Sequence, residues 1–335
     1  MDFTYKKCTQ CPRECGANRT SSFGFCGESE QIRIASACLH FGEEPPITVF
    51  GGSGTIFLTG CNLRCAFCQN YQISQQGMGA YISFDDFAEI CIRLQEKGAE
   101  NINIVTASHA VPALAKALET AKTKGLEIPV CWNSSAYEKV QVLELLDGLV
   151  DIWLPDFKSI NSDLSGKVFK AKDYPEHAKE AILYMTKKSP LVLKNVRNPN
   201  NPTETREKML SGVIVRHLFL PGHMEDTILA LDWLKKNVDG KAFVSLMSQY
   251  TPVPFKGDND AEATQRKNAL SAMENRLVSK GEFQEIQDIL AAYDFENLFY
   301  QELEQDTSWL PDFAKTQPFS NELAKPIWHW KKCFI

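Results

Sequence analysis

From about residue 83 onward, the apolar residues of this chain alternate between two kinds of spacing. Phe87, Ile90 and Leu94 recur at the spacing of a helix, between Ser83, a good N-cap, and Gly98, a helix-ending residue. Short apolar runs separate such segments and predict strands. We expect strands at 55–59, 102–105, 128–132, 149–154, 213–220 and 242–247, and helices between them at 84–97, 112–124, 140–146, 175–187 and 226–237.

This alternation of strand and helix predicts an α/β fold with parallel strands and right-handed crossovers. The number of strands indicates a partial (β/α)6 TIM-like barrel over residues 51–250. We expect residues 1–50 to form a Cys-rich N-terminal cap and an extended segment. Residues 251–335 are expected to be an α/irregular C-terminal extension packed on the barrel. Within it, 282–293 has helical periodicity, whereas the polar run 255–265 predicts a loop.

The composition narrows the classes of protein that fit. The chain has 335 residues, a formal net charge of −6 and a pI near 5.6, so we expect no nucleic-acid partner. No stretch reaches the roughly 18 apolar residues of a membrane span, and the first residues lack an apolar signal core. We therefore expect a cytoplasmic protein with no membrane partner.

Three of the 11 cysteines stand directly after the expected strand at 55–59. Cys61, Cys65 and Cys68 have the spacing C-x3-C-x2-C. A closed structural metal site uses four protein ligands, whereas three thiolates on a [4Fe-4S] cluster leave one iron open to a substrate or cofactor. We therefore expect such a cluster here. The alternative is zinc, which would need a fourth ligand from elsewhere in the chain.

A second group of cysteines lies near the N-terminus, at Cys8, Cys11, Cys15 and Cys26. The segment has too few aliphatic residues for a core of its own, so a bound metal is a reasonable source of stability. Zinc and a second iron–sulfur cluster both fit, and the alternative is a set of free thiols packed on the main domain. The remaining cysteines are scattered, and we expect all four to be small buried hydrophobic residues: Cys38, Cys91, Cys131 and Cys333.

Polar residues stand at the ends of several expected strands, where a (β/α) barrel binds its ligands. Asn133 and Ser134 follow one strand, Asp156 and Lys158 follow the next, and Arg216 lies near the end of the strand at 213–220. We expect these side chains to meet the cysteine loop at one rim. Asp156 and Lys158, two positions apart on an extended segment, point the same way and offer opposite charges to a zwitterionic ligand. The alternative is an ordinary ion pair at a strand end.

The cysteine motif, with the aromatic residue Phe67 directly before the third cysteine, resembles the signature of radical SAM enzymes. The wider sequence resembles one branch of that superfamily, proteins related to pyruvate formate-lyase activating enzyme and often labelled PflX-like. The blocks that carry this resemblance are Cys11–Arg13, Phe57–Asn70, Leu154–Lys158, Arg216–Gly222, Ser245–Tyr250 and Pro326–Trp330.

The resemblance implies a partial TIM-like barrel with a [4Fe-4S] cluster and S-adenosylmethionine (SAM) at its open rim. A reduced cluster would cleave SAM to methionine and a 5′-deoxyadenosyl radical that abstracts hydrogen from a substrate. Phe67 would lie against the adenine, and Asp156 and Lys158 would match a D-x-K element that contacts SAM. Asn133, Ser134 and Arg216 would contact SAM as well. The family's Gly-Gly-Glu element is absent, because Thr106–His109 stands in its place.

The resemblance also implies a reducing partner, flavodoxin or ferredoxin. The substrate is either a glycyl radical enzyme, as for an activase, or a small molecule. The alternative function is a non-catalytic iron–sulfur or zinc protein that transfers electrons or binds metal.

Overall fold

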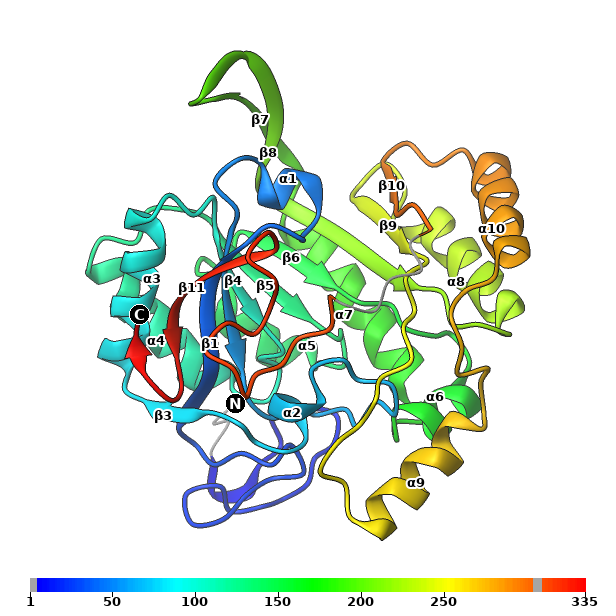
Figure 1. Ribbon diagram of the computed structural model, residues 1–335, viewed down its shortest axis with the longest axis horizontal. Coiled ribbons are helices and arrows are strands. Elements are labelled where there is room, and N and C mark those ends of the chain that lie inside the picture. The colour runs from blue at the N-terminus through cyan, green and yellow to red at the C-terminus, as the bar shows by residue number, and fades with distance from the viewer. Residues whose placement is uncertain (1–4, 304–308) are drawn as a thin grey trace.

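The structure is a computed structural model that describes residues 5–303 and 309–335, and its centre is one twelve-stranded sheet. The strands of its parallel part, in spatial order, are β10 (Leu298–Tyr300), β9 (Phe243–Met247), β8 (Asn201–Leu218), β6 (Ile152–Pro155), β5 (Val130–Ser134), β4 (Ile102–Val105) and β2 (Ser53–Leu58). Figure 1 shows them curving around a common axis.

Antiparallel strands complete the sheet beyond β2. They are β1 (Ile32–His40), β11 (Ala324–His329) and β12 (Cys333–Phe334), with β3 (Ala80–Ile82) paired to β1 and β7 (Val192–Asn198) paired to β8. The two ends of the sheet, β10 and β12, do not pair with each other. The predicted α/β fold with a partial barrel is therefore confirmed, and the sheet is not closed.

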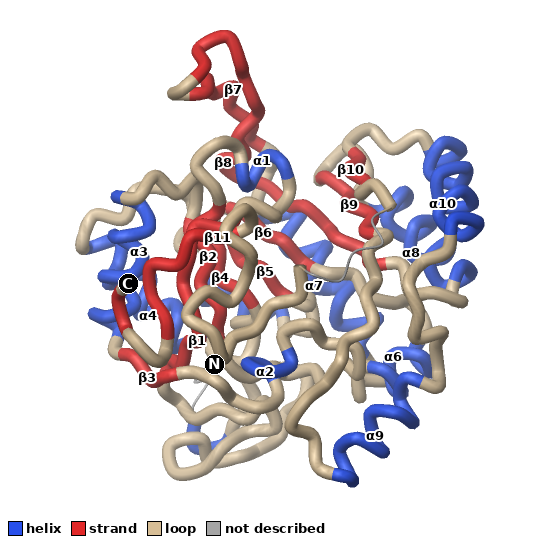
Figure 2. The backbone as a smooth tube through the Cα atoms, in the orientation of Figure 1, coloured by secondary structure: helices blue, strands red, loops and turns tan. Residues whose placement is uncertain are grey.

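Helices surround the strands, as Figure 2 shows in blue. The longer ones are α3 (Phe84–Glu96), α4 (Val111–Thr123), α7 (Tyr174–Lys188), α8 (Met224–Asn237), α9 (Asp260–Leu270) and α10 (Lys280–Tyr293). The shorter ones are α1 (Pro45–Thr48), α2 (Tyr71–Ser74), α5 (Val140–Leu143) and α6 (Ser162–Val168), with single 3₁₀ turns at Tyr5–Lys7 and Glu144–Leu146. None of the helices in the described ranges is long and apolar enough to cross a membrane.

Helix α3 shows how local sequence sets these boundaries. The Ser83 hydroxyl accepts the backbone N–H of Asp86, and the Asp86 carboxylate accepts the backbone N–H of Ser83, which forms a capping box. The expected helix at 84–97 therefore begins where the sequence predicted. Its apolar face, including Phe87 and Leu94, is fully buried in the main core.

The two faces of the sheet have different surroundings. Alternate strand residues such as Ile104, Trp132 and Val215 pack with the helices in one large core. On the other face, Phe57 and Val105 form a smaller cluster with Phe313 of the C-terminal extension. The inner face of the barrel is therefore partly covered by the chain's own C-terminal residues.

The polar run at 255–265 was predicted to be a loop, and this prediction is wrong from residue 260 onward. Helix α9 starts there because the Asn259 side chain accepts the backbone N–H groups of Ala261 and Glu262, and the Glu262 carboxylate accepts the N–H of Asn259. No residue of α9 is buried, so the sequence carries no apolar periodicity to reveal it.

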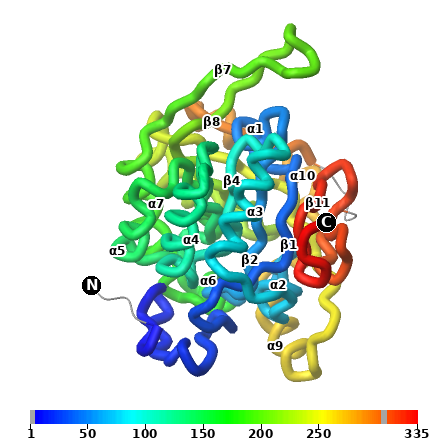
Figure 3. The backbone as a smooth tube through the Cα atoms, turned by 90° about the vertical axis from the view of Figure 1, so that its left-hand side faces the viewer, coloured from blue at the N-terminus to red at the C-terminus, as the bar shows by residue number. Residues whose placement is uncertain are grey.

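Two further features differ from the sequence prediction. Strand β8 extends well before residue 213 and forms an exposed hairpin with β7, which projects from one end of the molecule. Cys333 is exposed, whereas Cys38, Cys91 and Cys131 are buried as expected. The Cys-rich N-terminal cap lies at the opposite end from the hairpin, next to the carboxyl end of β2 (Figure 3).

Candidate active site

The carboxyl ends of β5, β6 and β8 bring three predicted side chains into contact. Arg216 Nε donates to Asp156 Oδ1 at 2.9 Å, and Arg216 Nη2 donates to Asn133 Oδ1 at 2.6 Å. Lys158 Nζ donates to the second carboxylate oxygen of Asp156 at 2.7 Å. Four residues that the sequence placed at three strand ends therefore form one network.

Two glutamates that the sequence analysis missed extend this network from the opposite end of the barrel. The segment between β1 and α1 places a Glu43 carboxylate oxygen 3.4 Å from Arg216 Nη1 and the other 3.4 Å from Asn133 Nδ2. The Ser245 hydroxyl donates to Glu44 at 2.8 Å. Ser245 could have been found, because it lies in register with Arg216 across β8 and β9.

Burial and neighbouring charges act in opposite directions on the pKa values of the residues in this network. Burial by itself would raise the pKa of Asp156, but the positive charges of Arg216 and Lys158 lower it. Burial would lower the pKa of Lys158, and the negative charges of Asp156 and Cys65 raise it instead. For Glu44 burial has the larger effect and raises the pKa despite Arg216. Glu44 therefore takes up a proton more readily than Asp156.

The cysteine loop begins at a turn that only glycine can make. Gly60 has φ +73°, and a Cβ atom there would lie 2.3 Å from Cγ of Glu28. Beyond it, the backbone N–H of Leu63 donates to Cys61 Sγ at 3.3 Å, and Cys68 Sγ lies 3.3 Å from Ser74 Oγ. Hydrogen bonds to sulfur of this kind tune the potential of an iron–sulfur cluster.

The three thiols of this loop lie around Lys158. Burial, followed by the nearby Cys68, raises the pKa of Cys61 to about 12, and burial also raises the pKa of Cys65 and Cys68. The positive charge of Lys158 acts on all three in the opposite direction. Thiols in such a place ionise when a metal centre supplies positive charge. This donor set therefore fits the predicted [4Fe-4S] cluster, beside the charged network.

Other predicted site residues lie nearby without joining the network. The Ser134 hydroxyl donates to Glu138 at 2.7 Å on the opposite face of β5, because neighbouring strand residues alternate in direction. The Phe67 ring is buried against Phe169 and Tyr250, with ring centroids 6.0 and 5.5 Å away. Their predicted contacts with SAM remain predictions.

The cysteines of the N-terminal cap also lie together. Cys8, Cys11 and Cys26 are buried and Cys15 is exposed. Within residues 5–303 and 309–335, no group of three or more His, Cys, Asp or Glu side chains is arranged to hold one metal ion. This applies equally to the Cys61 loop. A four-iron cluster differs from a single ion because each thiolate binds a different iron atom, so its cysteines need not converge on one point.

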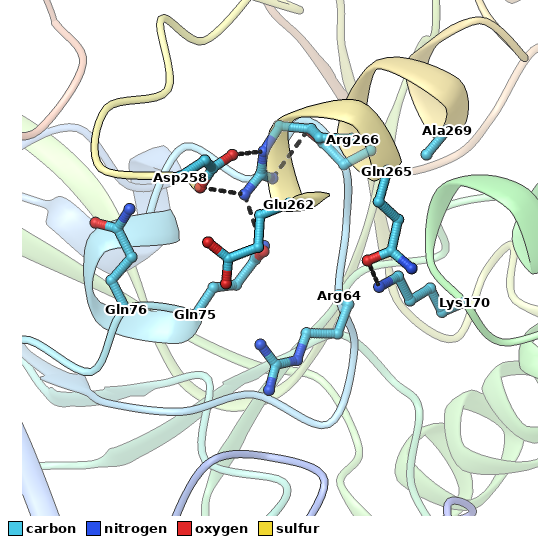
Figure 4. Close-up of a pocket in the computed structure, with 10 residues that line it drawn as sticks. Arg64, Gln75, Gln76, Lys170, Asp258, Glu262, Gln265, Arg266 and Ala269 are labelled. Atoms are coloured by element: carbon cyan, nitrogen blue, oxygen red, sulfur yellow. Dashed lines mark hydrogen bonds and ion pairs between the residues drawn. The ribbon is translucent and has the colours of Figure 1, made fainter. Parts of the chain in front are cut away.

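A polar pocket lies on the outer side of the cysteine loop, beside α9 (Figure 4). Arg266 pairs with Asp258 at 2.7 Å, and its Nη1 lies 3.4 Å from the carbonyl oxygen of Ala66. Gln75 Nε2 donates to the carbonyl of Cys65 at 3.1 Å. Lys170 completes the lining, and burial followed by the positive charges of neighbouring arginines lowers its pKa. Three basic residues (Arg64, Lys170 and Arg266) and two acidic ones (Asp258 and Glu262) line the pocket, so it has a small excess of positive charge, and it is bonded to the loop backbone.

The family model described as the radical SAM superfamily matches residues 55–231. This chain belongs to the radical SAM superfamily. The matched region contains the cysteine loop and the strand ends that supply Asn133, Asp156, Lys158 and Arg216. An uncharacterized protein of Methanocaldococcus jannaschii is 33% identical over 256 residues, which cover 74% of this radical SAM chain and 67% of that protein.

Solved structures are similar to this radical SAM chain at low identity. SuiB of Streptococcus suis bound to S-adenosylmethionine gives a TM-score of 0.46 at 13% identity and covers 72% of this chain and 48% of SuiB. A domain of pyruvate-formate lyase-activating enzyme from Bacteroides vulgatus gives 0.36 at 11% identity, covering 57% of this chain and 91% of that one. The chain spans about half the length of SuiB, and no substrate follows from these similarities.

Proposed function

We propose that this chain is an enzyme that cleaves S-adenosylmethionine reductively, with a [4Fe-4S] cluster bound by Cys61, Cys65 and Cys68. The observation that carries the proposal is that these thiols lie within electrostatic reach of Lys158, which itself pairs with Asp156 at 2.7 Å in a network of opposite charges. When bound, a reduced [4Fe-4S] cluster supplies the electron for cleavage to methionine and a 5′-deoxyadenosyl radical, which takes hydrogen from the substrate.

The charged network would hold the amino-acid part of SAM. Arg216 and Lys158 supply positive charge for its carboxylate, and Asp156 and Glu43 supply negative charge for its amino group. Glu43 would thus serve where the family's Gly-Gly-Glu element is missing. These side chains are mostly buried, so their hydrogen bonds fix the direction of the ligand in a site with little water.

For the substrate, the finer proposal is a small molecule rather than a glycine-bearing loop of a glycyl radical enzyme. Phe313 and Phe319 pack on Phe57 on the inner face of the barrel, with ring centroids 5.3 Å away in both cases. Gln72, which follows the cysteine loop, accepts the backbone N–H of Phe313 at 2.7 Å. This supports a small substrate because the chain itself covers the barrel beside the cluster loop.

For the electron donor, the proposal is an acidic protein of the flavodoxin or ferredoxin class in a cytoplasmic setting. It would approach the positively charged pocket, because Arg266 and Gln75 contact the backbone of Ala66 and Cys65 there. An electron arriving at this surface has a short path to the loop.

The test is anaerobic reconstitution with iron and sulfide, followed by dithionite and SAM. We expect 5′-deoxyadenosine from the unmodified protein and from C333S, which alters an exposed cysteine outside both groups. Intact SAM beside a fully reduced cluster, while a reference radical SAM enzyme turns over, would overturn the proposal in favour of a non-catalytic electron carrier. SAM turnover with the small-molecule or the protein fraction of an extract would then identify the substrate class.

A further inference from the structure

The four cysteines of the N-terminal cap are folded into one group by tight turns. The backbone N–H of Cys8 donates to the carbonyl of Ala17, and the N–H of Gly16 donates to the carbonyl of Cys8, both at 3.0 Å. Burial would raise the pKa of the Cys15 thiol, but backbone groups and the nearby Cys8 lower it. Cys8 and Cys26 both lie within electrostatic reach of Cys11. Residues separated by up to 18 positions therefore present their thiols to one another.

A buried cation faces this group. Arg19 is 2% exposed, and its guanidinium donates to the carbonyls of Glu28, Ser29 and His109 at 3.1, 2.5 and 2.6 Å. Its Nη1 also lies 3.7 Å from Cys8 Sγ. No carboxylate of the described residues forms an ion pair with Arg19, since the nearby Glu28 pairs with Arg33 at 3.7 Å. Because a buried charge needs a partner of opposite sign, Arg19 suits a group of thiolates.

The cap group directly adjoins the cysteine loop of the proposed active site. The carbonyl of Cys26 accepts the backbone N–H of Cys61 at 3.2 Å. Arg13 Nε donates to the Asn62 carbonyl at 2.7 Å. Burial raises the pKa of Cys11, and the nearby Asn62 side chain acts on it in the opposite direction. One hydrogen bond between main chains thus separates a ligand of one group from a ligand of the other.

We propose that Cys8, Cys11, Cys15 and Cys26 hold a second iron–sulfur cluster that exchanges electrons with the first. Zinc has no redox chemistry, whereas the hydrogen bond of 3.2 Å between the Cys61 N–H and the Cys26 carbonyl brings the cap group next to the cluster loop and favours a centre that exchanges electrons. The cluster takes one electron from a reduced one-electron carrier protein and passes it to the cluster on the Cys61 loop, with no bond or proton moved. This inference rests on the proposed function of that loop.

The experiment counts clusters in the anaerobically reconstituted full chain. We expect two [4Fe-4S] equivalents in the unmodified protein and in C333S, and one in each of C11S, C15S and C65A. Since Cys15 is exposed, C15S tests the site with little risk to folding, and a matching circular dichroism melt confirms this. We also expect the reduced unmodified protein to show an electron paramagnetic resonance signal broadened by two interacting clusters. Each variant that lacks a cysteine of one group should show the signal of an isolated cluster.

The possible outcomes separate the two proposals. One zinc per chain that C11S and C15S lose, or a single iron–sulfur cluster that both variants keep, would overturn the second cluster. Two clusters without magnetic interaction would overturn electron exchange between them. Retention of both clusters in C65A would instead overturn the assignment of the first.

Discussion

The two cysteine groups touch one another, yet their surroundings differ in kind. Three thiols of the Cys61 loop face side chains of both signs from several strand ends, among them Asp156, Lys158 and Arg216. In the cap, the nearest charge is a single buried cation, Arg19, which lies 3.7 Å from Cys8 Sγ and acts on Cys26 as well. Under the proposals above, the first arrangement would hold a ligand that carries its own charges, whereas the second would satisfy a metal centre by itself. Ligand count and charge pattern would then distinguish a reactive site from an auxiliary one.

The largest difference should appear when one cysteine is removed from each group. We expect C65A to abolish SAM cleavage with any reductant, because its cluster loses one of only three protein ligands. We expect C11S to lower cleavage driven by a donor protein more than cleavage driven by dithionite. The measurement is 5′-deoxyadenosine formed per chain, with C333S as the control. SAM cleavage that survives in C65A would contradict this difference between the two cysteine groups.

Neutralising the carboxylate at the centre of the charged network should have the next largest effect. D156N leaves Arg216 and Lys158 facing each other without their shared anion, so we expect kcat/KM for SAM cleavage to fall about 100-fold. The matched control is D163N, which alters an exposed ion pair with Lys172. Equal rates for D156N and D163N would show that the network does not act on SAM.

Arg13 connects the two regions, so its removal should loosen their contact. Its guanidinium donates to the carbonyls of Asn62, Lys170 and Phe169. We expect R13A to lower the free energy of unfolding by about 3 kcal/mol, since charged donors bind carbonyls strongly. R13K keeps the positive charge but not the forked geometry of the guanidinium, so it should recover only part of the lost free energy of unfolding. Denaturant unfolding measures both, and an unchanged midpoint in R13A would contradict this role.

The smallest predicted effect is a pH dependence of the folding stability that His109 contributes next to the N-terminal cap. Burial, together with the charge of Arg19, lowers the pKa of His109 to about 3. Its folded pKa lies below the ordinary value of about 6.5, so stability from the neutral ring is complete above pH 6.5 and declines as pH falls toward 3. Between pH 7 and 5 we expect a loss of about 2 kcal/mol. Thermal unfolding should show a smaller loss in H109N, and equal losses would refute this.

The sequence predicted the barrel and much of the site because both follow from local patterns. Apolar periodicity locates β4 and α3, and the strand-end rule then brings Asn133, Asp156 and Arg216 to one place. Ser134 is the exception among the predicted residues. Neighbouring residues of a strand point to opposite faces of the sheet, so its side chain points away from that of Asn133.

Other parts could not be predicted because their cause is not local. Glu43 and Glu44 reach the network only because β1 runs antiparallel to β2 and returns the chain beneath the barrel. Helix α9 depends on its cap, and the β7–β8 hairpin exposes most of its side chains. None of these three features produces a pattern of apolar residues from which the sequence could predict it.

The pairing of β1 with β11 has a consequence for biosynthesis. Ser36 pairs with His329, and the backbone N–H of Trp330 donates to the carbonyl of Ala35 at 3.0 Å. The edge of β1 at Ser36–His40 therefore stays unpaired on the ribosome until nearly 300 further residues have been made. The strand beside it, β2, leads into the cysteine loop. We therefore expect iron–sulfur delivery to follow the pairing of β11 with this edge.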